Sequence, residues 1–158
     1  MPVTFNENLD GTGLRVAIAV SRFRSVITER MLAGAMEGLA ELGVDDESVT
    51  VAWVPGSFEL SFAARRFAET GKFDAVICIG CVIKGETDHN EYINNQAARG
   101  IAEISEQTGV PCIFGVITPN NFEQALARAG EGTTNKGYEA AVTGVVMANL
   151  KKRLAELG

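Results

Sequence analysis

The sequence is short of several features that would define a protein class at once. No apolar run approaches the roughly 20 residues that a membrane-spanning helix needs. The first residues lack the basic and apolar regions of a signal peptide. The chain has 14 basic and 20 acidic residues, and its net charge of −6 disfavours a nucleic-acid backbone as a partner. These absences favour a cytoplasmic protein that binds neither membranes nor nucleic acid.

Cysteine is also scarce, with three residues, and an odd number does not suggest a disulfide framework. Cys78 and Cys81 form a C-x-x-C pair. However, Cys78 lies within an apolar segment, and the alternation of side chains along a strand would point it away from Cys81. A zinc site would need two further ligands, and the chain has no second C-x-x-C. We therefore interpret the cysteines as packing residues.

Histidine is scarcer still, because His89 is the single one in the chain. It closes the run 80–89, which directly follows the apolar segment 75–79. The carboxyl end of a buried strand is where ligands bind in α/β proteins, and imidazole is well suited to moving protons near neutral pH. Gly80 and Gly85 would let the backbone approach a ligand. A lone histidine is more often a surface or packing residue, so its role depends on its surroundings.

What the sequence does contain is a regular alternation of short apolar segments and longer helical patterns. Strands are expected at 14–20, 49–54, 75–79 and 111–116. The first helix is expected to be capped by Ser25 and to stop at Gly43. Further helices are expected at 59–70, 89–108 and 121–129. A last helix is expected to follow a break at 130–137 and to end near residue 157. This order predicts an α/β three-layer αβα sandwich with a four-stranded parallel sheet of flavodoxin-like type. We expect a single domain over 1–158, in which the arm 1–12 adds a strand to a neighbouring subunit.

Polar or aromatic residues follow each expected strand. Phe23 would lie at the rim after the first strand, where an aromatic ring either packs or meets a planar ligand. After the second strand, the turn at 55–59 would expose the N–H groups of Ser57 and Phe58. Glu59 would either favour the helix dipole or accept hydrogen bonds from hydroxyl groups. After the fourth strand, Asn120 is expected to cap a helix.

The loop 128–137 combines basic and glycine residues but differs from a phosphate-binding P-loop. A P-loop follows a strand and needs Gly-Lys-Ser/Thr, whereas here Gly137 follows Lys136 and the preceding element is expected to be a helix. We therefore exclude nucleoside triphosphate binding at this loop. Arg128 could clamp a phosphate with its planar fork, or pair with helix carbonyls.

Taken together, these segments match one family in order and spacing. The matching segments are Phe23, Pro55-Gly56-Ser57-Phe58-Glu59, Gly80-x-Val82-Ile83-Lys84-Gly85-x-Thr87-x-His89 and Arg128-Ala129-Gly130-x-x-x-x-Asn135-Lys136-Gly137. The chain resembles the 6,7-dimethyl-8-ribityllumazine synthases over about residues 14–154. The resemblance implies a transferase of the penultimate riboflavin step, which condenses 5-amino-6-(D-ribitylamino)uracil with 3,4-dihydroxy-2-butanone 4-phosphate. It also implies that neither a metal nor an organic cofactor is used.

The resemblance further implies which residues bind the two substrates. Phe23 would stack on the pyrimidine. The Ser57-Phe58 backbone and Glu59 would hold its ribityl hydroxyls, and Val82 with Ile83 would line its polar edge. Thr87 and the backbone of Gly85 and Glu86 would bind the phosphate, and His89 would move protons.

The resemblance implies a homo-oligomer with sites between the subunits of a pentamer. Phe114, Arg128 and Lys136 would reach across from the neighbour, with Arg128 gripping the phosphate. In the family that the chain resembles, an insertion in the loop after Gly130 is associated with assembly that stops at the pentamer. The loop has no such insertion here, so the resemblance favours a sixty-subunit shell. Riboflavin synthase is a further candidate partner that the sequence leaves open.

The chain departs from the family pattern at several positions. Asn90 follows His89 where an aromatic residue is usual, Arg24 replaces a common asparagine, and Ser61 replaces a usual proline. Residues 131–134 also differ in composition from the usual loop. These departures leave open a catalytically weak, flavin-binding or shell-forming paralogue. A flavodoxin-like binding module is less favoured, because 21–24 contains no glycine-rich phosphate cradle.

Overall fold

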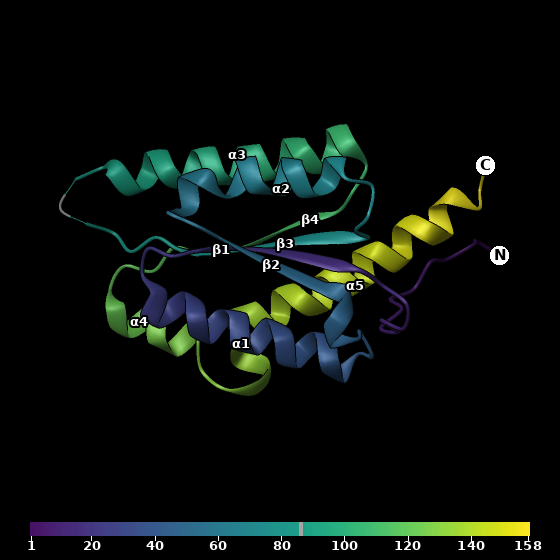
Figure 1. The fold of residues 1–158 in the computed structure, drawn as a ribbon, viewed down its shortest axis with the longest axis horizontal. Helices are drawn as coiled ribbons and strands as arrows, with labels where there is room; N and C mark the ends of the chain where they lie inside the picture. The colour runs from purple at the N-terminus through teal and green to yellow at the C-terminus, as the bar shows by residue number, and fades with distance from the viewer. Residues whose placement is uncertain (86) are drawn as a thin grey trace.

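The computed structural model describes residues 1–85 and 87–158, and within them it forms a sheet of four parallel strands (Figure 1). The strands are β1 (Val16–Ser21), β2 (Val49–Val54), β3 (Ala75–Cys81) and β4 (Cys112–Ile117), in the order β2-β1-β3-β4. All neighbouring pairs run parallel, so the carboxyl ends of the strands meet at one edge of the sheet. The predicted parallel sheet is confirmed.

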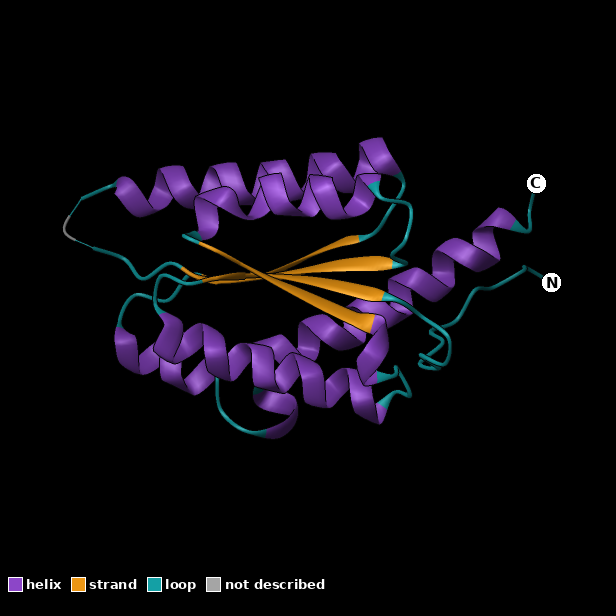
Figure 2. Ribbon diagram, viewed as in Figure 1, coloured by secondary structure: helices purple, strands orange, loops and turns teal. Residues whose placement is uncertain are grey.

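Helices cover both faces of this sheet (Figure 2). The helices α2 (Leu60–Glu69) and α3 (His89–Thr108) lie on one face, and α1 (Ser25–Glu41), α4 (Phe122–Arg128) and α5 (Lys136–Ala155) lie on the other. Short 3-10 turns cover Asp46–Ser48, Ser57–Glu59 and Gly132–Thr134. The predicted three-layer αβα sandwich is therefore confirmed. None of the helices in the described ranges is long and apolar enough to cross a membrane.

The central strands β1 and β3 are buried along their whole length, and their side chains alternate between two cores. Cys78 packs in the core beneath α2 and α3, whereas Cys81 packs in the core beneath α1 and α5. The two thiols therefore point to opposite faces, as the alternation predicted. Burial raises the pKa of Cys81 and of Cys112 to about 11, and raises that of Cys78 further still.

Two predicted helix caps are wrong. Ser25 is the first residue of α1, and the cap position belongs to Arg24, whose backbone is left-handed with φ 63° and ψ 42°. On α4 the cap is Asn121 rather than Asn120, because the Asn121 side chain accepts a hydrogen bond from the Gln124 N–H at 2.9 Å. The cap of α4 keeps the preferred residue type one position later, whereas Arg24 at the cap of α1 makes no side-chain cap bond.

A buried asparagine connects α5 to α1. Asn135 is 3% exposed, and its Nδ2 donates to the carbonyls of Arg30 at 3.1 Å and Gly130 at 2.8 Å. Its Oδ1 accepts from the N–H groups of Gly137 at 2.8 Å and Tyr138 at 3.1 Å, which caps α5. Asn135 therefore joins the turn before α5, the start of α5 and the backbone of α1.

The two helices approach closely enough to exclude side chains at two points. A methyl group on Gly137 would collide with the carbonyl oxygen of Met31, and one on Gly34 would collide with the Asn135 side chain. Glycine is therefore required at both positions for this packing. The close contact of α1 and α5 forms one wall of the core beneath the sheet.

The amino-terminal arm is held against α5 of its own chain. Asn149 Nδ2 donates to the carbonyls of Asn8 and Asp10, each at 2.9 Å, and Arg153 donates to the carbonyl of Asn6 at 2.9 Å. Figure 1 shows the amino terminus beside the end of α5. That the arm adds a strand to a neighbouring subunit stays a prediction.

We expect the substitution Asn149→Ala to release the arm. The two lost hydrogen bonds are worth roughly 1 kcal/mol each, so proteolytic cleavage within the first ten residues should become up to about thirtyfold faster. Limited proteolysis with mass spectrometry measures this rate. Asn95→Ala, at an exposed helical asparagine on α3, is the matched control and should leave the rate unchanged. Equal rates for both variants would contradict the anchoring role of Asn149.

Candidate functional site

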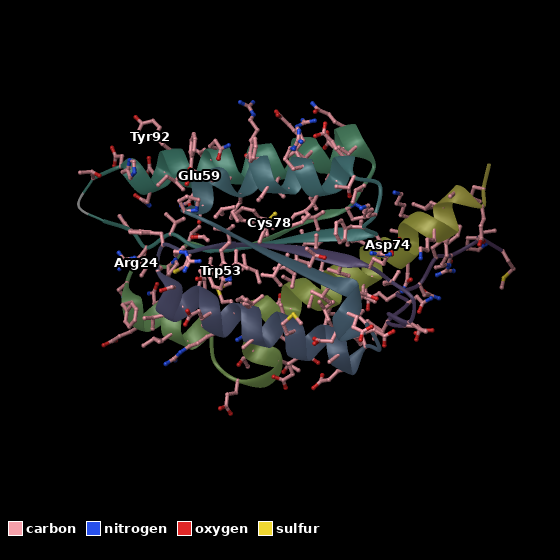
Figure 3. All side chains as sticks on the ribbon, viewed as in Figure 1. Arg24, Trp53, Glu59, Asp74, Cys78 and Tyr92 are labelled. Atoms are coloured by element: carbon pink, nitrogen blue, oxygen red, sulfur yellow. The ribbon has the colours of Figure 1, made fainter. Side chains whose placement is uncertain are left out.

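A cavity of about 610 Å³ opens at the carboxyl edge of the sheet. Its lining comes from the segment after β1, the turn after β2, and the segment that runs from the end of β3 into α3. In Figure 3, Arg24, Glu59 and Tyr92 lie toward this end of the molecule, and Asp74 lies toward the other. Open parallel sheets bind ligands at this edge, so the cavity is the candidate site.

Backbone hydrogen bonds beyond the strand ends hold the first two segments together. The N–H of Arg22 donates to the carbonyl of Val54 at 2.7 Å, and the N–H of Phe23 donates to that of Pro55 at 3.0 Å. Thr28 on α1 donates to the carbonyl of Ser21 at 2.7 Å, which fixes the chain as it leaves β1. These contacts place Phe23 beside the turn after β2.

Two large aromatic side chains of this region are exposed. The exposed fraction is 64% for Phe23 and 55% for Phe58, and both line the cavity. Aromatic rings bury a large area when they are covered, so neighbouring exposed rings mark a surface for a planar ligand or a partner. The predicted rim position of Phe23 agrees with this geometry.

The turn after β2 brings hydrogen-bonding groups to the cavity. Within the 3-10 turn, the N–H of Glu59 donates to the carbonyl of Gly56 at 3.1 Å, so the N–H groups of Ser57 and Phe58 precede the first bond of the turn. The Glu59 side chain is half-buried and lines the cavity. Glu59 also stands at the cap position of α2, so its position is compatible with both roles that the sequence left open.

The hydroxyl of Ser57 is buried, and among the described residues it has no hydrogen-bond partner. It lies over Gly80 at the end of β3, where a methyl group would collide with it. A buried hydroxyl without a partner costs free energy, because it has lost its hydrogen bonds to water. It therefore marks a point in the cavity lining where a polar ligand group or a water would be stabilised.

The segment after β3 continues to pair with the segment after β4. The N–H of Val82 donates to the carbonyl of Ile117 at 2.9 Å, and the N–H of Lys84 donates to that of Pro119 at 3.1 Å. This pairing holds the cavity wall that Val82 and Ile83 form. It also explains why β3 runs to Cys81, two residues further than the apolar pattern predicted.

His89 is the first residue of α3 and lies exposed at the cavity. Its backbone N–H donates to Thr87 Oγ1 at 3.3 Å, which makes a compact turn before the helix. Gly85 and Thr87 line the cavity next to it. Glu86, which the sequence also assigns to this loop, lies outside the described residues.

The structure divides the predicted site residues into two groups. The described residues that the resemblance assigns to one chain all line the cavity, and they are Phe23, Ser57, Phe58, Glu59, Val82, Ile83, Gly85, Thr87 and His89. Phe114, Arg128 and Lys136, which it assigns to the neighbouring subunit, do not line it.

The second group lies elsewhere on the same chain. Phe114 and Lys136 line a separate hollow of about 340 Å³ between the edge strand β4 and α5. Lys136 pairs there with Glu139 at 2.9 Å. Arg128 is exposed at the end of α4, and its guanidinium donates to the carbonyl of Gln124 at 3.1 Å. This is the helix-carbonyl contact that the sequence offered as one of two alternatives for Arg128.

Several lining residues were not predicted. Arg24, Cys81 and Ile93 line the cavity together with the predicted residues, and so does Asn90, which the sequence comparison had placed in the wall beside His89. Ile93 follows His89 by four residues, so helical periodicity alone would have placed it on the same face. The side chain of Arg24 follows Phe23 directly, but its direction depends on a left-handed backbone that the sequence does not reveal.

The cavity is mixed in charge and surrounded by apolar walls. Its ionisable lining residues include Arg24, Glu59 and His89. Within residues 1–85 and 87–158, no group of three or more His, Cys, Asp or Glu residues is placed to hold a metal ion. The arrangement offers an aromatic face, hydroxyl-binding groups and an imidazole in one place. It suits an organic ligand with a planar ring and several hydroxyl groups.

The fold and the cavity define a flavodoxin-like α/β protein with a candidate ligand site at the carboxyl edge of a parallel sheet. Comparison with family models then identifies the family, because the 6,7-dimethyl-8-ribityllumazine synthase model matches residues 13–152. The chain belongs to this family. Its general function is therefore in riboflavin biosynthesis, with an enzyme activity of the transferase type.

Proposed function

We propose that the protein is a single-domain enzyme that joins 5-amino-6-(D-ribitylamino)uracil to 3,4-dihydroxy-2-butanone 4-phosphate. The products are 6,7-dimethyl-8-ribityllumazine, inorganic phosphate and two molecules of water. One observation carries this proposal: a single cavity gathers the residues, from three separate strand ends, that the family pattern assigns to one chain.

The pyrimidine would bind on the side of the cavity formed by β1 and β2. The exposed ring of Phe23 offers a stacking face, and Val82 with Ile83 would line the polar edge of the ligand. The N–H groups of Ser57 and Phe58 and the carboxylate of Glu59 would hold the ribityl hydroxyls. The buried hydroxyl of Ser57 supports a polar ligand at this turn.

The four-carbon substrate would bind on the side of the cavity formed by the loop after β3. Thr87 and the backbone of Gly85 would receive its phosphate, together with Glu86, which lies outside the described residues. His89 would remain free to move protons at the reacting carbon atoms, because its backbone, not its ring, makes the bond to Thr87.

The remaining predicted residues would come from a neighbouring subunit. The ring of Phe114 is 44% exposed on the edge strand β4, and the hollow beside it contains Lys136. An exposed aromatic residue on a sheet edge favours coverage by a second copy of the chain. In the proposed pentamer, this surface and Arg128 would close the cavity of the next subunit. We propose a sixty-subunit shell of such pentamers, which sedimentation velocity would distinguish from a free pentamer.

The proposed chemistry needs placement more than strong acid or base catalysis. The amine attacks the ketone carbonyl and water leaves to give an imine. Phosphate is then eliminated, and the second nitrogen closes the ring on the remaining carbonyl with loss of a second water. Holding two substrates together in a productive geometry is worth up to roughly 7–11 kcal/mol. Proton transfer by His89 would assist imine formation and phosphate loss.

The direct test is to mix the purified protein with both substrates and follow the fluorescence of the lumazine product. We expect product to form faster than in the protein-free mixture. A rate equal to the uncatalysed one would exclude the proposed reaction.

One observation favours a second candidate. Asn90 lines the cavity next to His89, where the family usually has an aromatic residue, so the wall is more polar than usual. A catalytically weak paralogue that binds a flavin or forms a shell would accommodate this change. Such a protein would bind riboflavin in a fluorescence titration and yet fail to accelerate the condensation.

We expect Arg128→Ala to raise the KM for the butanone phosphate about tenfold, because a charge-assisted bond to the phosphate is lost. The KM for the pyrimidine should stay within about twofold, since that ligand carries no phosphate. Steady-state kinetics with each substrate varied in turn measures both values. Arg66→Ala removes another exposed arginine from the last turn of a helix, and it should change neither value. An unchanged KM for the butanone phosphate in Arg128→Ala would show that the phosphate assignment is wrong.

A mixture of two variants tests whether the site spans subunits. His89→Ala and Arg128→Ala are unfolded together and reassembled at equal concentrations. If the two residues serve one site from different chains, about one quarter of the interfaces carry neither substitution and regain full activity. If the mixture shows only the mean activity of the two variants, the residues do not meet across a subunit interface.

A further inference from the structure

Two arginines flank Phe23, and each places its guanidinium over an aromatic ring. Arg22 lies over Trp53, with its Cζ 5.1 Å from the ring centroid, and Arg24 lies over Phe23 at 5.3 Å. Figure 3 labels Arg24 and Trp53 in this region. Of the two arginines, Arg24 lines the cavity, whereas Arg22 is absent from its described lining. Arg24 can therefore contact a ligand in the cavity, whereas Arg22 lies outside the described lining.

The backbone does not explain why an arginine stands at position 24. Arg24 has φ 63°, and within the described residues it is the one residue other than glycine with a positive φ. Asparagine and glycine tolerate this left-handed conformation better than a long side chain does. The side chain also makes no capping hydrogen bond to α1. Neither the backbone conformation nor helix capping therefore accounts for an arginine at this position.

The guanidinium of Arg24 is available to a ligand in the cavity. Among the described residues, Arg24 forms no ion pair and no side-chain hydrogen bond. Burial raises the pKa of the Cys81 thiol to about 11, while the charge of Arg24 acts on it in the opposite direction. Arg24, Cys81 at the end of β3, and Thr87 and His89 of the following loop all line the same cavity, so the cation faces the space that this loop borders.

We propose that Arg24 binds the phosphate group of the ligand, from the same chain that supplies Thr87 and His89. A guanidinium can donate two parallel hydrogen bonds to phosphate oxygens, and its flat face can stay over the ring of Phe23 while it does so. Of the charged side chains in the described lining, Arg24 would attract a phosphate, whereas Glu59 would repel it. This inference rests on the proposed function and extends it, because it adds a phosphate ligand within one chain to Arg128 of the neighbour.

The test compares Arg24→Asn, Arg24→Lys and Arg22→Asn in the assembled, full-length protein. Inorganic phosphate is titrated by calorimetry, and the KM values of both substrates are measured. We expect Arg24→Asn to weaken phosphate binding about tenfold, because a charge-assisted bidentate contact is lost. Arg24→Lys should fall between Arg24→Asn and the unchanged protein, since it keeps the charge but not the planar fork.

Arg22→Asn is the matched control, because it removes the same charge two residues away without reaching the cavity. It should bind phosphate within about twofold of the unchanged protein, as charges outside the site are screened by salt. The melting temperature of Arg24→Asn should stay equal or rise, since asparagine suits the left-handed backbone. Loss of binding together with retained stability separates a ligand contact from a folding defect.

The two binding measurements also identify the source of the phosphate. A higher KM for the butanone phosphate, with the KM of the pyrimidine unchanged, assigns Arg24 to the substrate. If the affinity for inorganic phosphate falls while both KM values stay unchanged, Arg24 contacts the released product. Equal phosphate affinity in Arg24→Asn and the unchanged protein, or an equal loss in both asparagine variants, overturns the inference. If phosphate binding depends on Arg24 but no lumazine forms, the proposed function fails and the phosphate contact stands.

Discussion

Replacing Asn135 with alanine is expected to lower the free energy of unfolding by about 3–4 kcal/mol, because four hydrogen bonds worth roughly 1 kcal/mol each are lost. The loss is concentrated in a residue that is 3% exposed, so water cannot easily replace the missing partners. The carbonyls of Arg30 and Gly130 lose their donor, and the first turn of α5 loses its cap. Urea unfolding followed by circular dichroism measures the change.

The matched control for this prediction is Asn121→Ala. Asn121 also caps a helix, α4, but it is exposed, and its side chain accepts one hydrogen bond, from the Gln124 N–H. Its loss should cost only about 1 kcal/mol, the usual value for a helix cap. Similar destabilisation in both variants would mean that the links from Asn135 to α1 and to the preceding turn contribute little.

The second large effect is expected in catalysis. His89→Ala should lower kcat about 10²-fold, at the lower end of what a positioned proton-transfer group contributes. The KM values of both substrates should change little, since the backbone N–H of His89, which bonds to Thr87, is retained in the variant. Steady-state rates of lumazine formation measure the effect. A kcat equal to that of the unchanged protein would remove His89 from the proposed mechanism.

Two further measurements separate proton transfer from a structural role. Added imidazole should restore part of the lost rate in His89→Ala, because it can enter the space left by the side chain and carry protons in its place. Asp88→Ala is the matched control, since Asp88 is the exposed neighbour that makes no side-chain cap bond and is absent from the described cavity lining. A comparable loss of rate in Asp88→Ala would indicate that the loop, rather than the imidazole, is what the reaction needs.

The sequence was sufficient to predict the sheet, because buried parallel strands are almost wholly apolar and glycines mark the ends of helices. Gly43 and Gly109 both have positive φ just after α1 and α3, where the predicted stops lie. The end of β3 was harder to predict. Its last two residues join the sheet only because Gly80 and Cys81 pair with Val116 and Ile117 of β4, a contact between distant parts of the chain.

The candidate site was predictable where residue order determines position. Phe23, Glu59 and His89 follow three strands of one parallel sheet, so the fold alone brings them to the same edge. Arg24 could not be found in this way, because the direction of its side chain depends on an unusual φ. The role of Phe114 could not be derived from one chain either, since its ring faces outward from an edge strand.

The buried cysteines have a practical consequence for following assembly. Alkylating reagents attack the thiolate, and burial raises the pKa of Cys81 and Cys112 to about 11, so at neutral pH only about one native thiol in 10⁴ is in the reactive form. A cysteine introduced at the exposed Asp46 would ionise far more readily and accept a fluorophore first. The chain can thus be labelled at one chosen point without removal of its own thiols, and energy transfer between labelled copies would report how subunits associate.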